Sequence, residues 1–334
     1  MEPRDHSRLM VVHTDSDQIE HKHFYDVADY LRSGDALVIN ETKVIPARLL
    51  GVKTDTGVPV EVLLLRRIST TDWEALVRPG RRLKPGAFCS FGDGLLRCEV
   101  LENVLETGGR IVRFSYEGVF EELLDTLGEM PLPPYIHTAL SDPGRYQTVY
   151  ARAEGSAAAP TAGLHFTPEL LGKIRGKGVQ VIPVLLHVGL GTIRPVKEKD
   201  ISEHRMHSEW YEVTEEAADA LNRIHANGGR IICVGTTSVR TLETVADDSG
   251  CIHAGRGDTA IFIKPGVRIK TVDALITNFH LPQSTLLMLV STLMGREKAL
   301  TAYRTAVAER YRFFSFGDAM LILGRKAPYD TEEK

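Results

Sequence analysis

A change of hydrophobic pattern along the chain limits the folds that it can adopt. From about residue 150 onward, strand-like and helical patterns alternate, which is typical of an α/β domain with a largely parallel sheet. Before that point the chain contains short β-rich runs separated by turns rich in Gly and Pro, which are typical of a small barrel. These runs are 58–65, 72–77, 95–101 and 110–116.

The β-rich part is predicted to be an insertion. A buried strand is expected at 35–40, before the barrel, and the proline-rich segment 130–136 returns the chain to the main body as a stiff linker. We therefore predict an α/β fold in two domains. They are a discontinuous α/β catalytic domain of residues 1–48 and 130–334, and an inserted β-barrel domain of residues 49–129.

Three residues are expected to begin helices of the α/β domain. Thr167 is a good N-cap with Pro168 as the first helical residue, Thr214 precedes a helix that ends at Gly228-Gly229, and Ser284 precedes an apolar helix.

Composition excludes several classes of protein. The 334 residues carry a formal net charge of −4, so global charge does not indicate nucleic-acid binding, although local patches can bind RNA. No apolar run reaches membrane-spanning length, and the charged N-terminus lacks a signal-peptide core. The four cysteines form no CxxC pair, which argues against a zinc site and a disulfide framework. We predict a cytoplasmic protein with no metal and no membrane contact.

The segment 155–166, GSAAAPTAGLHF, combines small side chains with Gly and Pro and carries His165 near its end. Pro160 and Gly163 argue against a helix. Such a loop lets a ligand approach the backbone and puts one imidazole at its exit. A tight, buried connection without a ligand is the alternative.

His280 holds a similar place after the strand-like segment 273–277. An imidazole can act as acid or base near neutral pH. Either histidine could instead hold its loop by hydrogen bonds to the backbone. Two histidines in loops that follow strands favour a shared cleft, because ligands of α/β sheets bind at such loops.

The segment 235–243, GTTSVRTLE, follows the apolar run 231–234. It offers the hydroxyls of Thr236, Thr237 and Ser238 at a helix N-terminus, where free N–H groups favour an anion. A carboxylate or a phosphate would suit this position. Ordinary N-capping is the alternative, and Arg240 early in the helix keeps the ligand interpretation open.

Other motifs give weaker signals. HVGLGTIR (187–194) contains a GxG but lacks the third glycine of a dinucleotide fingerprint. His204, His207 and Glu209 have HxxH spacing without a second ligand pair, so a structural or substrate-contacting role is favoured over metal binding. The aromatic residues of 311–316 are expected in the core, with base stacking by one of them as an alternative.

These stretches together resemble the S-adenosylmethionine:tRNA ribosyltransferase-isomerase family of queuosine biosynthesis. The resemblance extends from about Arg8 to about Ile322 and keeps the same order throughout. Besides APTAGLHF, HVGLGT, GTTSVRTLE, DALITNFHLPQST and YRFFSFGDAM, it includes VIPARL (44–49), EVLLLR (61–66), MPLPPYI (130–136), RYQTVYA (145–151) and MHSE (206–209).

The resemblance implies an enzyme that uses S-adenosylmethionine as a substrate and needs no cofactor. Its ribosyl unit is transferred to the aminomethyl group of 7-aminomethyl-7-deazaguanine at the wobble position of a tRNA with a GUN anticodon. Rearrangement then gives epoxyqueuosine, and adenine and methionine leave. A monomeric protein is expected.

With the resemblance, the motifs assign roles to particular residues. The proposed proton-transfer residues are His165, His280 and, second to them, Asp273. The proposed substrate-binding residues are Asn40, Arg48, Thr161, His187, Arg194, Thr236, Thr237, Ser238, Arg240 and Asn278. The proposed tRNA contacts are Arg78, Arg81, Arg82, Lys84 and Arg145, although a solvated hairpin turn is the simpler interpretation of Arg78–Lys84.

The chain departs from the family pattern in places. Family members usually begin with further residues, including an aspartate-leucine-proline element, before the segment that matches Arg8. The usual NNTR reads NETK at 40–43, Ala157 replaces a common valine, and the segment 247–257 is short. None of these departures removes a polar residue assigned above.

Two other functions remain open from the residues alone. An RNA methyltransferase that uses S-adenosylmethionine predicts a glycine-rich loop after the first strand and an acidic residue ending the next, and neither is convincing here. An RNA-binding module built on the barrel predicts a stronger basic bias and no polar loops after the α/β strands.

Overall fold

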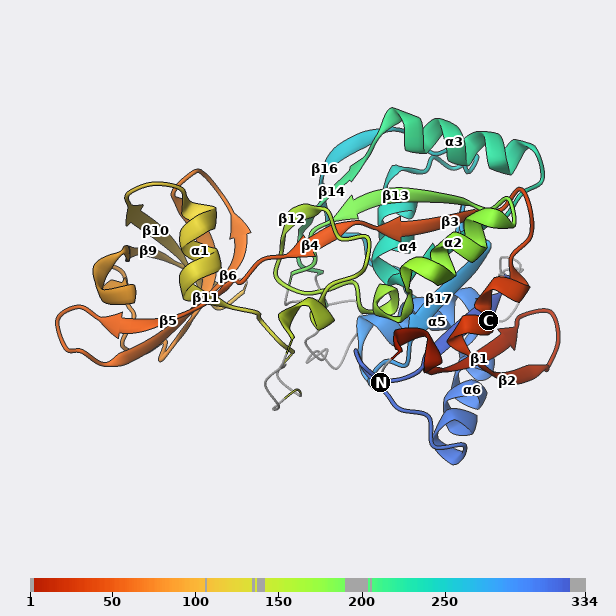
Figure 1. Cartoon of the computed structure of the whole chain (residues 1–334), viewed down its shortest axis with the longest axis horizontal. Coiled ribbons are helices and arrows are strands. Elements are labelled where there is room, and N and C mark those ends of the chain that lie inside the picture. The colour runs from red at the N-terminus through yellow and green to blue at the C-terminus, as the bar shows by residue number, and fades with distance from the viewer. Residues whose placement is uncertain are drawn as a thin grey trace.

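The computed structural model describes residues 3–105, 107–133, 136, 142–189, 204 and 206–324. Figure 1 shows two parts side by side, a layered α/β part and a smaller barrel. The fold class predicted from the sequence, an α/β domain with an inserted small β-barrel, is confirmed.

Nine strands of the described chain form one mixed sheet in the α/β part. Its centre, β13–β3–β15–β17, is parallel, and β18 and β1 are parallel to each other but antiparallel to β17. In sheet order the strands are β16 (Gly255–Thr259), β14 (Glu209–Val213), β13 (Gln180–Leu186), β3 (Ala36–Asn40), β15 (Ile231–Val234), β17 (Ala274–Asn278), β18 (Ala319–Leu323), β1 (Arg8–His13) and β2 (Ile19–His23).

Both faces of this sheet are covered, so its central strands are continuous apolar runs. In β3, Ala36 and Val38 join one core and Leu37 and Ile39 join the other. The first core packs against α3 (Glu215–Ala226), α4 (Gly235–Val245), α5 (Thr285–Met294) and α6 (Arg296–Ala308). The second packs against α2 (Pro168–Gly176) and the 3-10 segments η2 (Phe24–Tyr30) and η5 (Thr161–His165).

The three predicted helix starts are confirmed. The hydroxyl of Thr167 accepts a hydrogen bond from the N–H of Leu170, that of Thr214 from Ala217, and that of Ser284 from Leu287. Each cap satisfies one N–H that the first turn of a helix leaves without an internal partner.

The barrel closes where β5 pairs with β8. Its strands are β5 (Arg48–Lys53), β6 (Pro59–Arg67), β7 (Asp72–Arg78), β8 (Phe88–Phe91), β9 (Leu96–Val104) and β10 (Gly109–Tyr116). A Cβ at Gly51 would lie 2.3 Å from the carbonyl oxygen of Ser90, so only glycine lets the two strands approach here. Helix α1 (Phe120–Leu127) covers the barrel core through Phe120 and Leu124.

Short elements join the two parts. Strands β4 (Thr42–Val44) and β12 (Ala153–Ser156) form a parallel pair, and β11 (Gly128–Glu129) pairs with β5. The remaining 3-10 segments are η1 (Arg4–His6), η3 (Gly92–Gly94) and η4 (Pro143–Tyr146). The division of the chain at 48 and 130 stays a prediction. Of the described helices, none combines the length and the apolar character that crossing a bilayer requires.

Candidate active site

A pocket opens at the carboxyl end of the parallel strands β15 and β17, where ligands of α/β sheets usually bind. The pocket is partly open to solvent. Three segments distant in sequence form most of its wall: the η5 loop, the start of α4 and the stretch after β17. The lining residues with polar side chains are Thr161, Thr236, Thr237, Thr277, Asn278, His280, Ser284 and Ser315.

The N-terminus of α4 faces this pocket. Gly235 turns the chain from β15 into α4 at φ 82°, a left-handed conformation that favours glycine. Among the described residues no side chain caps the helix, and the first N–H groups of a helix have no partner within it. The hydroxyl of Thr237 is buried and has no hydrogen-bond partner among the described residues. This end of α4 is therefore suited to an anionic group.

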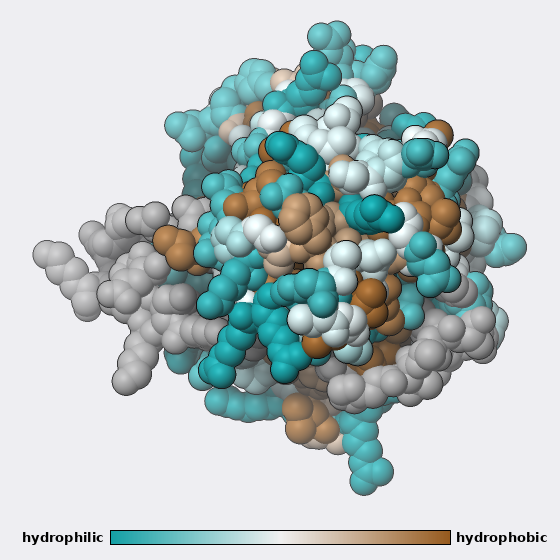
Figure 2. Space-filling view, turned by 90° about the vertical axis from the view of Figure 1, so that its left-hand side faces the viewer, coloured by the Kyte–Doolittle hydropathy of each residue, from teal (hydrophilic) through white to brown (hydrophobic). Residues whose placement is uncertain are grey.

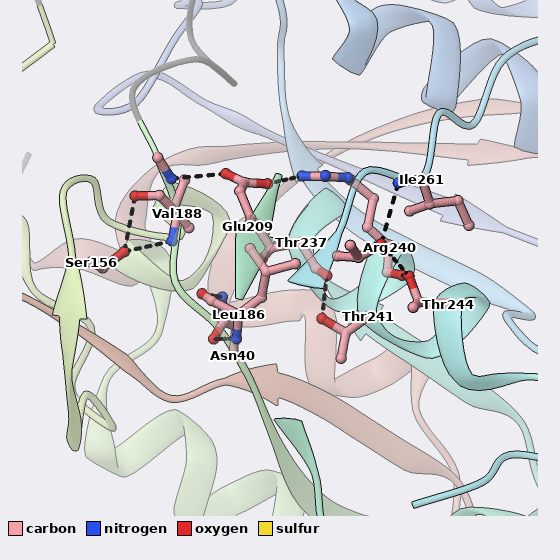
Figure 3. A network of polar contacts seen from close by, with 12 residues as sticks. Asn40, Ser156, Leu186, Val188, Glu209, Thr237, Arg240, Thr241, Thr244 and Ile261 are labelled. Carbon is pink, nitrogen blue, oxygen red and sulfur yellow. Dashed lines mark hydrogen bonds and ion pairs between the residues drawn. The ribbon is translucent and has the colours of Figure 1, made fainter. Parts of the chain in front are cut away.

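Two predicted substrate residues of the same helix point elsewhere. The Ser238 hydroxyl donates to the carbonyl oxygen of Val234 at 2.8 Å. Arg240 is 2 % exposed and forms an ion pair with Glu209, whose other oxygen accepts the N–H of Gly189 at 2.8 Å (Figure 3). Neither residue lines the pocket. Arg240 links α4 to β14, and no sequence pattern predicts Glu209 as its partner.

His280 lines the pocket directly. Its ring Nε2 lies 2.7 Å from the hydroxyl of Thr277, and its backbone N–H donates to the hydroxyl oxygen of Tyr303 at 2.9 Å. Burial lowers the pKa of His280 to about 4. The ring is therefore neutral near pH 7.

His165 lies behind the pocket wall and is hydrogen-bonded through both ring nitrogens. Nε2 is 3.0 Å from the amide nitrogen of Asn278, and Nδ1 is 2.7 Å from the hydroxyl of Ser7. The ring also stacks on Phe24, with 4.9 Å between centroids. Burial lowers the pKa of His165 to about 4, so it too is neutral. Because Asn278 donates to Nε2, its oxygen faces Thr161, whose hydroxyl donates to it at 3.0 Å.

Other predicted residues bond within the protein. The amide of Asn40 bridges β3 to β13 by donating to the carbonyl of Leu186 at 2.9 Å and accepting its N–H at 3.1 Å (Figure 3). His187 bonds to the Thr42 hydroxyl at 2.9 Å, and burial lowers its pKa. Arg48 forms ion pairs with Glu61 and Glu129 at the edge of the barrel.

Of the remaining predicted residues, one lies away from the pocket and the other falls outside the described part of the chain. Asp273 precedes β17 and so lies at the opposite end of the strand, where its carboxylate accepts the N–H of Ile231 at 2.9 Å. The structure does not bring it to His280. Arg194 lies outside the described residues.

The predicted tRNA contacts fall on both parts of the molecule. Arg78, Arg81, Arg82 and Lys84 are exposed on the β7–β8 turn of the barrel. Figure 2 views the molecule from the barrel side, where hydrophilic and hydrophobic groups are interspersed. Arg145 lies instead in η4 of the α/β part, with its guanidinium 5.6 Å from the centre of the Phe316 ring.

Phe314 is the member of the aromatic segment that lines the pocket, and it adopts a left-handed φ of 72°. Tyr311 and Phe313 belong to or pack against the core, as expected. Thr277 and Ser7, which bond to His280 and His165, have no role predicted from the sequence. Thr277 immediately precedes Asn278 on its strand, whereas nothing in the sequence brings Ser7 to His165.

One group of three possible metal ligands occurs among the described residues. Donor atoms of Asp247, Cys251 and His253 lie within 4.8 Å of one another, and His253 bonds to Asp247 at 2.8 Å. The group follows the C-terminal end of α4, whereas the pocket is at its N-terminus. That the protein works without a metal stays a prediction.

A model of the queuosine biosynthesis protein family matches residues 1–322. The chain belongs to this family. The resemblance seen in the sequence is thereby confirmed over nearly the whole chain.

Curated relatives of the family carry the name S-adenosylmethionine:tRNA ribosyltransferase-isomerase. The protein from Pelotomaculum thermopropionicum is 61% identical over 320 residues, 96% of this chain and 94% of the relative. The protein from Moorella thermoacetica is 62% identical over 324 residues, 97% of this chain and 94% of the relative. A crystal structure of S-adenosylmethionine tRNA ribosyltransferase from Thermotoga maritima is 41% identical, with a TM-score of 0.54, and the match covers 97% of this chain and 94% of that one.

Proposed function

We propose that this protein is an S-adenosylmethionine:tRNA ribosyltransferase-isomerase. It moves the ribosyl unit of S-adenosylmethionine to the aminomethyl group of 7-aminomethyl-7-deazaguanine at the tRNA wobble position and rearranges it to give epoxyqueuosine. Adenine and methionine are released. The observation that carries the proposal is the pocket at the carboxyl edge of the sheet, with an open helix N-terminus and a neutral histidine, in a member of this family.

S-adenosylmethionine binds in that pocket with its methionine carboxylate at the start of α4. The N–H groups of that helix end and the hydroxyls of Thr236 and Thr237 are the donors. Phe314 lines the same pocket, and purines stack well on aromatic rings. This arrangement supports the substrate-binding roles predicted for Thr236 and Thr237.

His280 is the group that accepts a proton from the carbon next to the sulfonium. The positive sulfur acidifies that carbon, so a neutral base within hydrogen-bond reach can remove its proton. Burial keeps His280 neutral, and Thr277 holds one of its nitrogens. His165 does not line this pocket but bonds to Asn278, which does. His165 therefore acts by orienting the amide of Asn278.

The tRNA must present its wobble base unstacked from the anticodon loop, because the aminomethyl group has to reach the pocket. The exposed arginines of the barrel turn and Arg145 are the proposed backbone contacts. A tRNA with a GUN anticodon, no cofactor, a monomeric state and a cytoplasmic location complete the proposal.

A turnover assay tests the proposed function. Purified protein is mixed with S-adenosylmethionine and tRNA that bears the aminomethyl-deazaguanine, and free adenine and the nucleoside mass are followed. The expected result is adenine release together with a product of epoxyqueuosine mass. A methylated nucleoside without adenine release would make the protein a methyltransferase and overturn the proposal.

A further inference from the structure

The loop that follows α4 carries an aspartate, a cysteine and a histidine close together, at the end of the helix opposite the pocket. The oxygen, sulfur and nitrogen donors of Asp247, Cys251 and His253 lie within 4.8 Å of one another. Within the part of the chain that the structure describes, no other group of this kind occurs. Thiolate sulfur, imidazole nitrogen and carboxylate oxygen are the donors that Zn²⁺ takes from proteins. The donor set of this loop therefore matches Zn²⁺.

The backbone of the loop puts the three side chains on one face. Ala246 and Ile252 form an antiparallel bridge. Asp247 therefore lies opposite Cys251, and its N–H donates to the carbonyl oxygen of Cys251 at 3.0 Å. Since side chains alternate along an extended segment, Cys251 and His253 share one face, and Ile252, which is 2 % exposed, takes the other. The backbone itself thus brings the donors together.

The loop is anchored to the rest of the α/β part. The side-chain amide of Asn222, on α3, donates to the carbonyl oxygen of Ile252 at 2.8 Å and accepts its N–H at 2.9 Å. The N–H of His253 donates to the carbonyl oxygen of Val245, the last residue of α4, at 3.2 Å. The loop is therefore ordered before a cation binds, which lowers the free-energy cost of binding.

Asp247 is oriented by the loop and directs one oxygen to the histidine. Its Oδ1 accepts the N–H and the hydroxyl of Ser249 at 2.9 and 2.6 Å, and the N–H of Cys251 at 3.1 Å. Its Oδ2 lies 2.8 Å from Nε2 of His253. Hydrogen bonds of this kind orient the carboxylates that bind metals. The side chains of Asp247 and His253 are 42 % and 59 % exposed, so a cation can reach them from solvent.

The ammonium group of Lys270 does not take up these donors. It donates to the carbonyl oxygen of Ala246 at 2.7 Å and forms a 4.0 Å ion pair with Asp248, whose side chain is fully exposed. The charge of Asp248 offsets that of Lys270, so the negative charge of Asp247 favours a cation at the loop.

We propose that Asp247, Cys251 and His253 bind one Zn²⁺, with water as the fourth ligand. The cation takes the place of the proton between Asp247 Oδ2 and His253 Nε2, and the neutral imidazole keeps its proton on Nδ1. The Cys251 thiol releases its proton to solvent and bonds to the metal as a thiolate. The ion links the end of α4 to the segment that enters β16 and so stabilises the fold. This inference goes beyond the proposed function and does not depend on it.

The test titrates the protein, free of any affinity tag, with Zn²⁺ in competition with a chromophoric chelator, and separately with Co²⁺ as a spectroscopic probe. We expect one Zn²⁺ per chain. Co²⁺ should give a thiolate-to-metal charge-transfer band together with the visible bands of a tetrahedral site. Zn²⁺ at about 100 times its Kd should raise the melting temperature by about 5 °C, and a chelator should reverse the shift.

Two variants test the ligands, with His225→Gln as the matched control. Glutamine at 253 can keep a hydrogen bond to Asp247 but offers no imidazole nitrogen, and His225 lies in the last turn of α3, outside the group. We expect His253→Gln to weaken Zn²⁺ binding at least about 100-fold and the control to stay within about 2-fold of wild type. Cys251→Ser should abolish the charge-transfer band, because that band requires the thiolate.

A further measurement uses the wild-type protein alone. Cys251 is half-buried, whereas Cys89, Cys98 and Cys233 are buried, so iodoacetamide should modify Cys251 first. Saturating Zn²⁺ is expected to slow this alkylation at least about 10-fold, because the metal occupies the thiolate. Peptide mass spectrometry identifies the modified residue. This arm stands even where a variant does not fold.

Three outcomes overturn the proposal. Wild-type protein that binds Zn²⁺ no more tightly than about 1 mM has no site of this kind. An unchanged Zn²⁺ affinity in His253→Gln, or a charge-transfer band that persists in Cys251→Ser, places the metal elsewhere. Alkylation of Cys251 at the same rate with and without saturating Zn²⁺ removes the thiolate from the site.

Discussion

The two edges of the large sheet hold their buried polar groups in different ways. At the amino edge, Asp35 is bonded to Arg230 at 2.6 Å, and Asp273 accepts the N–H of Ile231. At the carboxyl edge, the hydroxyl of Thr237 has no partner among the described residues, and His280 faces a pocket. A satisfied charge holds the fold together, whereas an unsatisfied neutral group in a pocket is available to a ligand. The first edge therefore has a structural role, and the second is the proposed binding edge.

The largest expected effect comes from His280→Gln. Glutamine can keep a hydrogen bond to Thr277 but cannot carry the proton, so kcat falls by about 10² to 10⁴-fold. The melting temperature changes little, because the substitution also keeps the hydrogen bond from the backbone N–H of residue 280 to Tyr303. Single-turnover adenine release measures the effect, and wild-type kinetics in this variant would remove His280 from the mechanism.

Asp35→Asn tests the opposite edge. Asp35 is fully buried, and removal of its charge leaves Arg230 without its partner, so the free energy of unfolding falls by about 2–4 kcal/mol. The kcat below the melting transition stays near that of wild type. Urea denaturation and turnover at low temperature measure the two quantities.

The same variant has a characteristic pH dependence. Hydrogen bonds from Arg230 and from the N–H of Arg32 hold the pKa of Asp35 below its usual value despite burial. Its stabilising contribution is therefore complete above the unfolded pKa of about 4 and is lost as the pH falls through the lower folded value. The difference between wild type and Asp35→Asn should shrink below about pH 4. A constant difference down to pH 2 would contradict the assignment.

Two variants of His165 distinguish a positioning role of this residue from a role in proton transfer. His165→Phe keeps the stacking on Phe24 but breaks the bond to Asn278, so kcat should fall about 10-fold. His165→Gln can donate and accept, and should retain most of the activity. Equal, large losses in both variants would instead make His165 the group that carries the proton.

The smallest expected effect is that of Thr237→Val. The replacement has nearly the same shape and removes only a hydroxyl that has no hydrogen-bond partner within the described part of the chain, so stability is kept or slightly raised. The KM for S-adenosylmethionine should rise about 10-fold, with a smaller change in kcat. Thr241→Val on the same helix is a useful comparison, since the Thr241 hydroxyl donates to the helix backbone at 2.9 Å. Equal KM values for the two variants would contradict a ligand contact by Thr237.

Local chemistry let the sequence predict part of this arrangement. The caps at Thr167, Thr214 and Ser284 depend on neighbouring residues only, and all three are present. The loops that carry Thr161, Thr237 and His280 meet because strand ends meet at one edge of a parallel sheet. Their roles in catalysis and binding stay predictions.

Long-range partners could not be predicted in the same way. The ion pair of Arg240 with Glu209 and the bond between Ser7 and His165 join segments whose contact depends on the complete fold. The position of Asp273, by contrast, follows from the direction of its strand. It precedes its strand whereas Asn278 ends it, so strand direction alone separates the two residues by the length of β17.

The most direct test of the central claim is a crystal structure with S-adenosylhomocysteine, which lacks the reactive sulfonium. We expect the ligand at the carboxyl edge, with its carboxylate within hydrogen-bond distance of Thr237 and its ribose toward His280. A ligand bound at the amino edge beside Asp273, or on the barrel, would contradict the account.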